Sequence, residues 1–162
     1  MGIPYGILGI GFSINGLMVV FGQMPITRAM LGKKHTTIGA YGLIAYAVSF
    51  IGLGFAGLFQ FLPIVSFLAA TTVMIVGENL ISIPMTTLPS NMAPPADVGF
   101  YNGAFQTVTA LGTVAAGILG GAVLDGVANP LLVWILLALP AVPAIVMLAS
   151  ATRRIDPRAN RA

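Results

Sequence analysis

Long, nearly unbroken apolar segments dominate the pattern along the chain, and short polar stretches separate them. Five such segments cover residues 2–22, 38–58, 63–84, 101–124 and 130–150. A helix needs about 20 residues to cross a bilayer's hydrocarbon core, and each segment is at least that long. The strands of a membrane barrel would instead alternate polar and apolar positions, which these runs do not. The pattern therefore predicts an all-α fold: a polytopic bundle of five membrane-spanning helices.

The stretches between the spans complete the expected organisation. A polar loop covers residues 23–37, a Pro-rich linker covers residues 85–100, and short turns cover 59–61 and 125–129. Residues 1–150 then form one transmembrane domain, followed by a basic tail, residues 151–162, that we expect to be frayed. Pro140 and Pro143 lie in the middle of the last span and predict a kink there, because each removes a backbone hydrogen bond.

Composition supports a membrane protein and excludes several other classes. Of the 162 residues, 57% are hydrophobic and 7% are charged, whereas a soluble domain carries about 25% charged residues. The chain has no cysteine, one histidine and four acidic residues, which excludes thiol chemistry and gives no constellation of metal ligands. We find no catalytic triad and no phosphate-binding loop. The sequence thus predicts no enzyme, no cofactor and no metal site.

The basic residues predict the orientation. All seven Lys and Arg lie in the first loop or in the tail, namely Arg28, Lys33, Lys34, Arg153, Arg154, Arg158 and Arg161. The positive-inside rule makes this side cytoplasmic, so the N-terminus lies outside a plasma or inner membrane and the C-terminus inside. Because these charges serve topology, we expect no nucleic-acid partner. An outside N-terminus normally follows an earlier helix, so we also expect the chain to be part of a longer protein.

Glu78 is the one charged residue well inside a span. An acid in hydrocarbon costs on the order of 3 kcal/mol, so such a residue usually faces a bundle interior or a water-filled cavity. Thr71 and Ser82 share its helical face, and Asn79 lies alongside. Two interpretations stay open: an acid that couples transport to protons or binds a cation, and a structural acid bonded to a neighbouring helix. His35, in contrast, is expected to be a solvated loop residue.

The fourth span carries two further stripes. A polar stripe could line a substrate path or only hold helices together, and Asn15 of the first span offers the same two interpretations. A stripe of small residues permits close helix contact. The polar stripe consists of Asn102, Gln106, Thr109 and Thr113, and the packing stripe includes Gly103, Gly117 and Gly121.

Three regions together resemble a known family. The first is a basic loop with Gly22, Gln23, Pro25, Arg28, Gly32, Lys33 and Lys34. The second is a helix with Gly77, Glu78 and Pro84. The third is a glycine-rich course, a loop and helix with Ala93, Pro94, Gly99, Tyr101, Gly103, Gly112, Gly117, Gly120, Gly121 and Asp125. Their order resembles the C-terminal half of a major facilitator superfamily transporter, of the type that includes proton-driven drug and sugar efflux proteins.

The resemblance implies a partial major facilitator fold, helices eight to twelve of twelve. It implies that Glu78 faces the central cavity and that Arg28, Lys33 and Lys34 belong to a gating loop. The function it implies is part of a proton-coupled exporter, an antiporter of small molecules working by alternating access. Its partners would be the lipid bilayer, a small-molecule substrate, and the missing N-terminal helices or another membrane subunit.

Two other functions remain open at this point. The chain could be a truncated or accessory membrane protein without transport activity of its own. It could also form a small transporter as an oligomer, although five spans make a parallel pseudo-symmetric dimer awkward.

The orientation is testable with reporters. A reporter fused after Ala162 should read cytoplasmic, and one inserted within residues 59–62 should read external, because all Lys and Arg mark the cytoplasmic side. The measurement is paired phosphatase and fluorescent-protein fusions in whole cells. The reverse pattern would contradict the five-span topology.

Overall fold

The computed structural model describes residues 5–56 and 63–161. Its elements, in chain order, are α1 (Tyr5–Leu17), a π-helical turn (Met18–Gly22), α2 (Gln23–Met30), α3 (His35–Ala56), α4 (Pro63–Met92), α5 (Val98–Gly126), α6 (Pro130–Ala138) and α7 (Ala141–Ala151). Five helical stretches in this part of the chain are long and apolar enough to cross a membrane. This confirms the all-α fold with five candidate spans. The predicted span ends at residues 2–4 and 57–58, and the turn at 59–61, lie outside the described residues.

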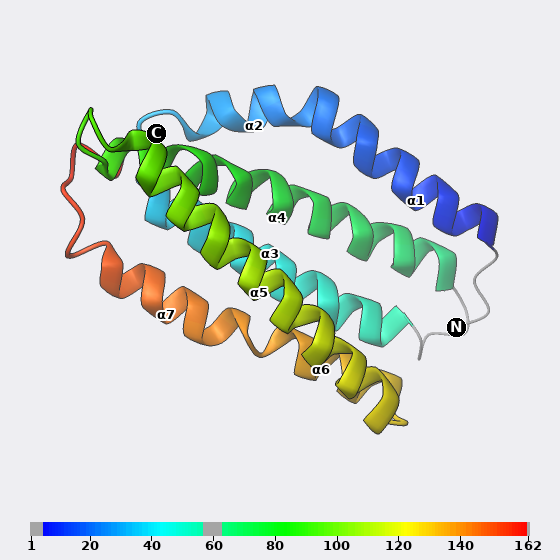
Figure 1. Cartoon of the computed structure of the whole chain (residues 1–162). Helices are drawn as coiled ribbons and strands as arrows, with labels where there is room; N and C mark the ends of the chain where they lie inside the picture. Colours follow the sequence, from blue (N-terminus) through cyan, green and yellow to red (C-terminus); the bar gives the residue numbers. More distant parts are fainter. Residues whose placement is uncertain (1–4, 57–62, 162) are drawn as a thin grey trace.

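The first helix continues beyond the predicted span. The sequence placed residues 23–37 in a loop, but α1, the π-helical turn and α2 follow one another without a break to Met30, as the rod above α4 in Figure 1 shows. Pro25 has no N–H for the carbonyl of Phe21, and its ring crowds that turn, which gives a reason for the wide π-turn just before it. The loop is therefore short, and Arg28 lies in the last turn of α2.

The helix that carries Glu78 is also longer than expected. The sequence ended this span at Pro84 and placed a linker from residue 85, but α4 runs through Pro84 and Pro89 to Met92, 30 residues in all. Helices in apolar surroundings tolerate proline where side chains and neighbours satisfy the backbone. Thr86 and Thr87, between the two prolines, donate side-chain hydrogen bonds to the carbonyls of Ser82 and Ile83, at 2.8 and 2.7 Å.

The kink predicted in the last span is confirmed. Helix α6 ends at Ala138, α7 begins at Ala141, and Leu139 and Pro140 form a turn between them. Asn129 caps the start of α6, since its side chain accepts hydrogen bonds from the amides of Leu131 and Leu132 at 3.0 and 3.3 Å.

Helix α3 is the centre of the bundle, and its closest neighbour is α4. A β-carbon on Gly42 of α3 would lie 2.9 Å from the carbonyl oxygen of Gly77 in α4, and one on Gly77 would lie 2.9 Å from the carbonyl oxygen of Gly42. The two backbones thus touch where neither residue has a side chain. Further along α3, a β-carbon on Gly54 would meet Leu131 of α6 at 2.9 Å.

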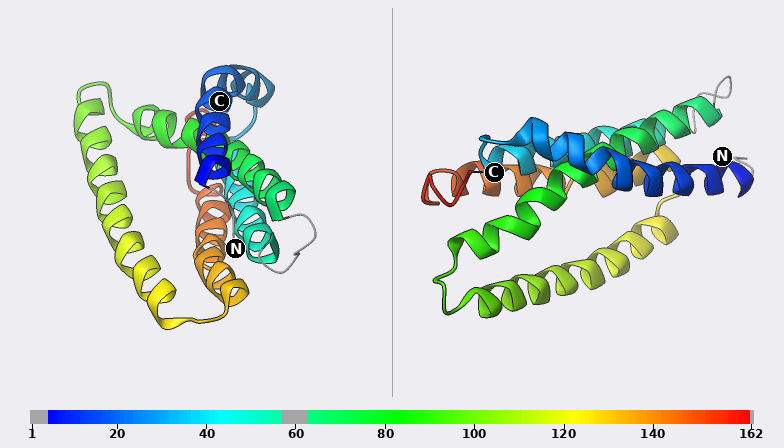
Figure 2. Two further views of the ribbon diagram at one scale, coloured as in Figure 1. Left: turned by 90° about the vertical axis from the view of Figure 1, so that its right-hand side faces the viewer. Right: turned by 90° about the horizontal axis from the view of Figure 1, so that it is seen from above.

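Helix α5 stands apart from this core. None of its residues is buried, and Figure 2 shows it splayed away from α1, α3 and α4 along most of its length. The packing stripe predicted on this helix makes no close contact here, because a β-carbon on Gly103, Gly117 or Gly121 would meet nothing within 4 Å. That these three glycines pack against a helix stays a prediction. Among the glycines that do meet a neighbouring helix closely in the described structure are Gly42, Gly77 and Gly54.

The C-terminal tail, expected to be frayed, folds back onto the start of α3. The Asn160 residue is 1% exposed. Its backbone carbonyl accepts a hydrogen bond from the backbone N–H of His35 at 2.8 Å. Its side-chain oxygen accepts a second hydrogen bond from the backbone N–H of Thr36 at 3.0 Å. Asn160 therefore caps α3 from a distant part of the chain. His35, expected to be solvated, is 1% exposed beneath the tail.

The helix crossing can be tested at Gly77. Gly77→Ala places a methyl group 2.9 Å from the Gly42 carbonyl oxygen, and we expect a loss of about 1–3 kcal/mol in unfolding free energy because the helices must separate. The measurement is detergent-denaturant titration followed by circular dichroism. Gly117→Ala is the matched control, since that site is open and alanine favours helix by up to about 1 kcal/mol. Equal behaviour of the two variants would contradict the crossing.

The cap can be tested at Asn160. Asn160→Ala removes the side-chain acceptor for the Thr36 amide, and we expect it to lower the unfolding free energy by about 0.5–2 kcal/mol. The control is Arg158→Ala, an exposed tail residue whose loss should change stability by less than about 0.5 kcal/mol. Hydrogen exchange at the first amides of α3 reports the cap directly. Unchanged protection in Asn160→Ala would show that the tail does not hold this helix end.

Candidate functional site

Glu78 lies near the middle of the 30-residue α4. Its side chain is exposed on the surface of the described bundle. The amide nitrogen of Asn15, on α1, donates a hydrogen bond to Glu78 Oε2 at 3.3 Å. The structure thus joins two residues that the sequence selected on separate grounds, and we refer to them as the Glu78–Asn15 pair.

Two helix contacts place this pair. Gly77 faces α3, and because successive helical residues are rotated by about 100°, Glu78 points to the flank of the contact between α3 and α4. On the other side, Gly11 brings α1 against α4, since a β-carbon there would lie 3.3 Å from the Phe67 ring and 4.0 Å from the Thr71 methyl group. Along α1, Asn15 lies one helical turn after Gly11. Along α4, Glu78 lies two turns after Thr71. These positions bring the Asn15 side chain within hydrogen-bonding distance of Glu78.

Tyr46 is a further neighbour of Glu78 that the sequence did not indicate. It lies on α3 beside the residue before Glu78, since a β-carbon on Gly77 would be 3.2 Å from the Tyr46 backbone nitrogen. Its ring stacks edge-on against Phe50, with ring centroids 6.1 Å apart. No local pattern marks Tyr46, because its position depends on how α3 and α4 cross.

The other residues predicted around Glu78 have local roles in the structure. Asn79 is 3% exposed, and its side chain donates to the carbonyl of Ile75 at 3.0 Å. Ser82 donates to the carbonyl of Asn79 at 2.8 Å. Thr71 is 8% exposed, next to α1. Asn79 and Ser82 thus bond within their own helix, and Glu78 is the member of the set whose side chain bonds to another helix.

The polar stripe on α5 is not brought to this site. Asn102 exchanges hydrogen bonds with Ser90 at the end of α4, at 3.0 and 3.3 Å. Thr109 and Thr113 donate to carbonyls one turn earlier in α5, at 2.9 and 3.0 Å, and Gln106 is exposed. Because α5 and α1 lie apart in both views of Figure 2, Asn15 does not join this stripe in the structure.

The basic residues gather at one end of the bundle. This end, where α2, α4 and α7 finish and α3 begins, carries all seven Lys and Arg and is called the basic end below. Arg28 lies in α2, and Lys33 and Lys34 lie in the short turn after it, where Gly32 takes a positive φ of 78°. Lys34 forms a backbone bridge with Arg161 of the tail.

The chemistry available at the Glu78–Asn15 pair is that of one carboxyl group with one amide donor. Such a group can take up and release a proton or attract a cation. Within residues 5–56 and 63–161, no group of three or more acidic or histidine side chains could hold a metal ion.

Comparison with known proteins gives one informative similarity. The chain is 28% identical over 128 residues to a Bacillus subtilis protein described as an uncharacterized MFS-type transporter; the match covers 77% of this chain and 31% of the relative. The chain thus spans about a third of that relative's length. No family model and no solved structure matches the chain. The similarity is distant homology to an MFS-type transporter, and the five apolar helices are those of a multi-pass membrane protein.

Proposed function

We propose that the chain is part of a proton-coupled exporter of small molecules that works by alternating access, and that Glu78 carries the coupled proton. The single observation that carries this is the position of Glu78. It is exposed near the middle of a helix long enough to span a membrane, and a second helix contacts it through Asn15.

The position argues against a purely structural acid. A structural carboxylate in hydrocarbon is normally enclosed and fully hydrogen-bonded. Glu78 is exposed instead, and its side chain makes one hydrogen bond, to Asn15. An exposed carboxyl group at mid-membrane depth is stable where it meets water or a further part of a transporter. A transport cavity supplies both.

The relative supports the transporter class. Its description as an MFS-type transporter agrees with the resemblance of the basic loop, the Glu78 helix and the glycine-rich course. In this proposal Asn102, Gln106, Thr109 and Thr113 of α5 contribute polar groups to a substrate path once further helices close the cavity. Arg28, Lys33 and Lys34 stay a proposed gating region at the basic end.

The proposed working unit includes more helices than this chain, because the match covers 31% of the relative. Those helices, or another membrane subunit, would form the opposite wall of the cavity. The proposed orientation has the basic end in the cytoplasm and the start of α1 outside. The alternative, an accessory membrane protein without transport of its own, differs in giving no proton-driven flux when the remaining helices are supplied.

The coupling role is testable by Glu78→Gln. Glutamine keeps the shape and can still accept from Asn15, but it cannot exchange a proton, so we expect the fold to persist and proton-driven flux to fall by at least about tenfold. The measurement uses a chimera in which this chain replaces the aligned part of the B. subtilis relative. Efflux of ethidium and tetraphenylphosphonium is followed in vesicles with an imposed pH gradient.

Asp125→Asn is the matched control, because it also removes one carboxylate but lies at the end of α5. It should leave driven flux near the parent value. Substrate exchange without a gradient should survive in Glu78→Gln, since exchange need not release the proton. Full driven efflux by Glu78→Gln would contradict the coupling role.

A further inference from the structure

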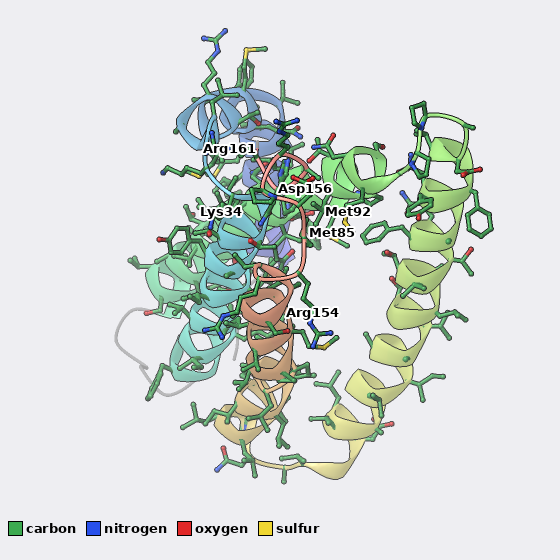
Figure 3. The ribbon with its side chains drawn as sticks, turned by 90° about the vertical axis from the view of Figure 1, so that its left-hand side faces the viewer. Lys34, Met85, Met92, Arg154, Asp156 and Arg161 are labelled. Atoms are coloured by element: carbon green, nitrogen blue, oxygen red, sulfur yellow. The ribbon has the colours of Figure 1, made fainter. Side chains whose placement is uncertain are left out.

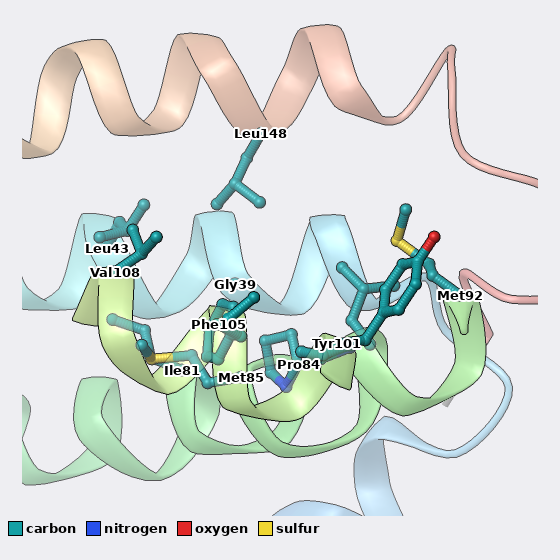
Figure 4. Close-up of a pocket in the computed structure, with 13 residues that line it drawn as sticks. Gly39, Leu43, Ile81, Pro84, Met85, Met92, Tyr101, Phe105, Val108 and Leu148 are labelled. Atoms are coloured by element: carbon teal, nitrogen blue, oxygen red, sulfur yellow. The ribbon is translucent and has the colours of Figure 1, made fainter. Parts of the chain in front are cut away.

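One hollow in the described structure lies away from the Glu78–Asn15 pair, between α5 and the core. It has a volume of about 660 Å³, within the range of small-molecule sites. Helices α3, α4, α5 and α7 line it, with Pro84, Met85, Met92, Phe105 and Leu148 among the lining residues. Figure 4 shows Leu148 reaching down from α7 towards these side chains. Its walls are almost wholly apolar, so we call it the apolar groove.

The groove runs inward from the basic end. Met92 is the last residue of α4, Tyr101 lies in the first turn of α5, and Leu148 lies in the last turn of α7. Val108, also in the lining, lies seven residues beyond Tyr101, or about 10 Å deeper along the helix. An occupant with a long apolar part and a head at the basic end fits this shape.

Two arginines lie at the basic end, the end from which the groove runs inward. Arg153 and Arg154 follow α7, and backbone bonds to Ser150 and Ala151, at 3.2 and 2.9 Å, hold them in a turn. Both side chains are exposed, and neither has a carboxylate partner among the residues that the structure describes. Figure 3 shows Arg154 on the side of α7 that faces α5, with Met85 and Met92 on the same side of the core. Together with Ala149 and Ser150 they line a second, smaller hollow.

We propose that the apolar groove with Arg153 and Arg154 is a binding site for an anionic phospholipid. An acyl chain occupies the groove, where it covers apolar side chains. The phosphate of the head group accepts hydrogen bonds from the guanidinium groups, which suit phosphate geometry. Basic pockets between helices at the cytoplasmic face are a general way of holding such lipids. This site is separate from the proposed proton site.

The experiment places a tryptophan in the groove and measures which lipid lies beside it. Phe105→Trp, combined with Trp134→Phe to remove the chain's one native tryptophan, is reconstituted in phosphatidylcholine vesicles. Part of the lipid is then replaced by chain-brominated phosphatidylglycerol or by chain-brominated phosphatidylcholine, both of which quench tryptophan on contact. We expect the apparent affinity of the site for phosphatidylglycerol to exceed that for phosphatidylcholine by roughly tenfold, because two arginines attract the anionic head group.

Matched variants separate the contributions. Adding Arg153→Gln and Arg154→Gln should abolish the preference, whereas Arg28→Gln with Lys33→Gln removes the same charge from the α2 side and should keep it. Val114→Trp, on the exposed face of α5, should be quenched equally by both lipids. Inorganic phosphate should not displace the brominated lipid, which distinguishes a lipid from a free anion.

The proposal is overturned if both lipids quench Phe105→Trp equally. It is also overturned if the two pairs of charge variants lose the preference alike, because the selectivity would then be a general effect of net charge. Circular dichroism verifies that each variant keeps its helical content, and the conservative Phe105→Trp change leaves the groove lined by an aromatic ring.

Discussion

The contact between Gly42 and Gly77 fixes the arrangement of the helices around α3. With backbone carbonyls 2.9 Å from the places where side chains would begin, the crossing of α3 and α4 allows no other residue at either position without separation of the helices. Because Gly77 must face α3, the rotation of α4 about its axis is set. Glu78 is then turned to the side that α1 covers in part, and the Asn15 hydrogen bond follows.

This geometry gives the bundle two chemically different sides. On the α1 side, one carboxyl group lies near the middle of a helix that is apolar along most of its length. On the α5 side, the surface is an apolar groove that runs inward from the basic end, where Arg153 and Arg154 lie. The first suits proton exchange in a transporter and the second suits a lipid. The distant similarity to an MFS-type transporter agrees with the proposed proton exchange and gives no information on a lipid site.

The sequence predicted what depends on local composition and missed what depends on distant contacts. Five helices follow from the length of the apolar segments, and the break at Pro140 follows from proline chemistry. The sequence could not place Asn160 on the start of α3, since 124 positions separate it from Thr36, nor could it bury His35. The close approach of Gly42 and Gly77 was not predicted, because a small residue does not by itself say which helix comes close. Glu78 and Asn15 were both predicted as candidates, but their pairing depends on how α1 packs on α4.

The most direct test of the account is whether position 78 meets water within the membrane. The chain has no cysteine, so Glu78→Cys and Val146→Cys each carry a single thiol, the latter on the exposed apolar face of α7. Both are treated in membranes with a charged methanethiosulfonate, which reacts with thiolates in water and not in hydrocarbon. We expect rapid modification of Glu78→Cys and almost none of Val146→Cys. Equal, low reactivity of the two variants would place Glu78 against lipid and contradict a proton site open to a transport cavity.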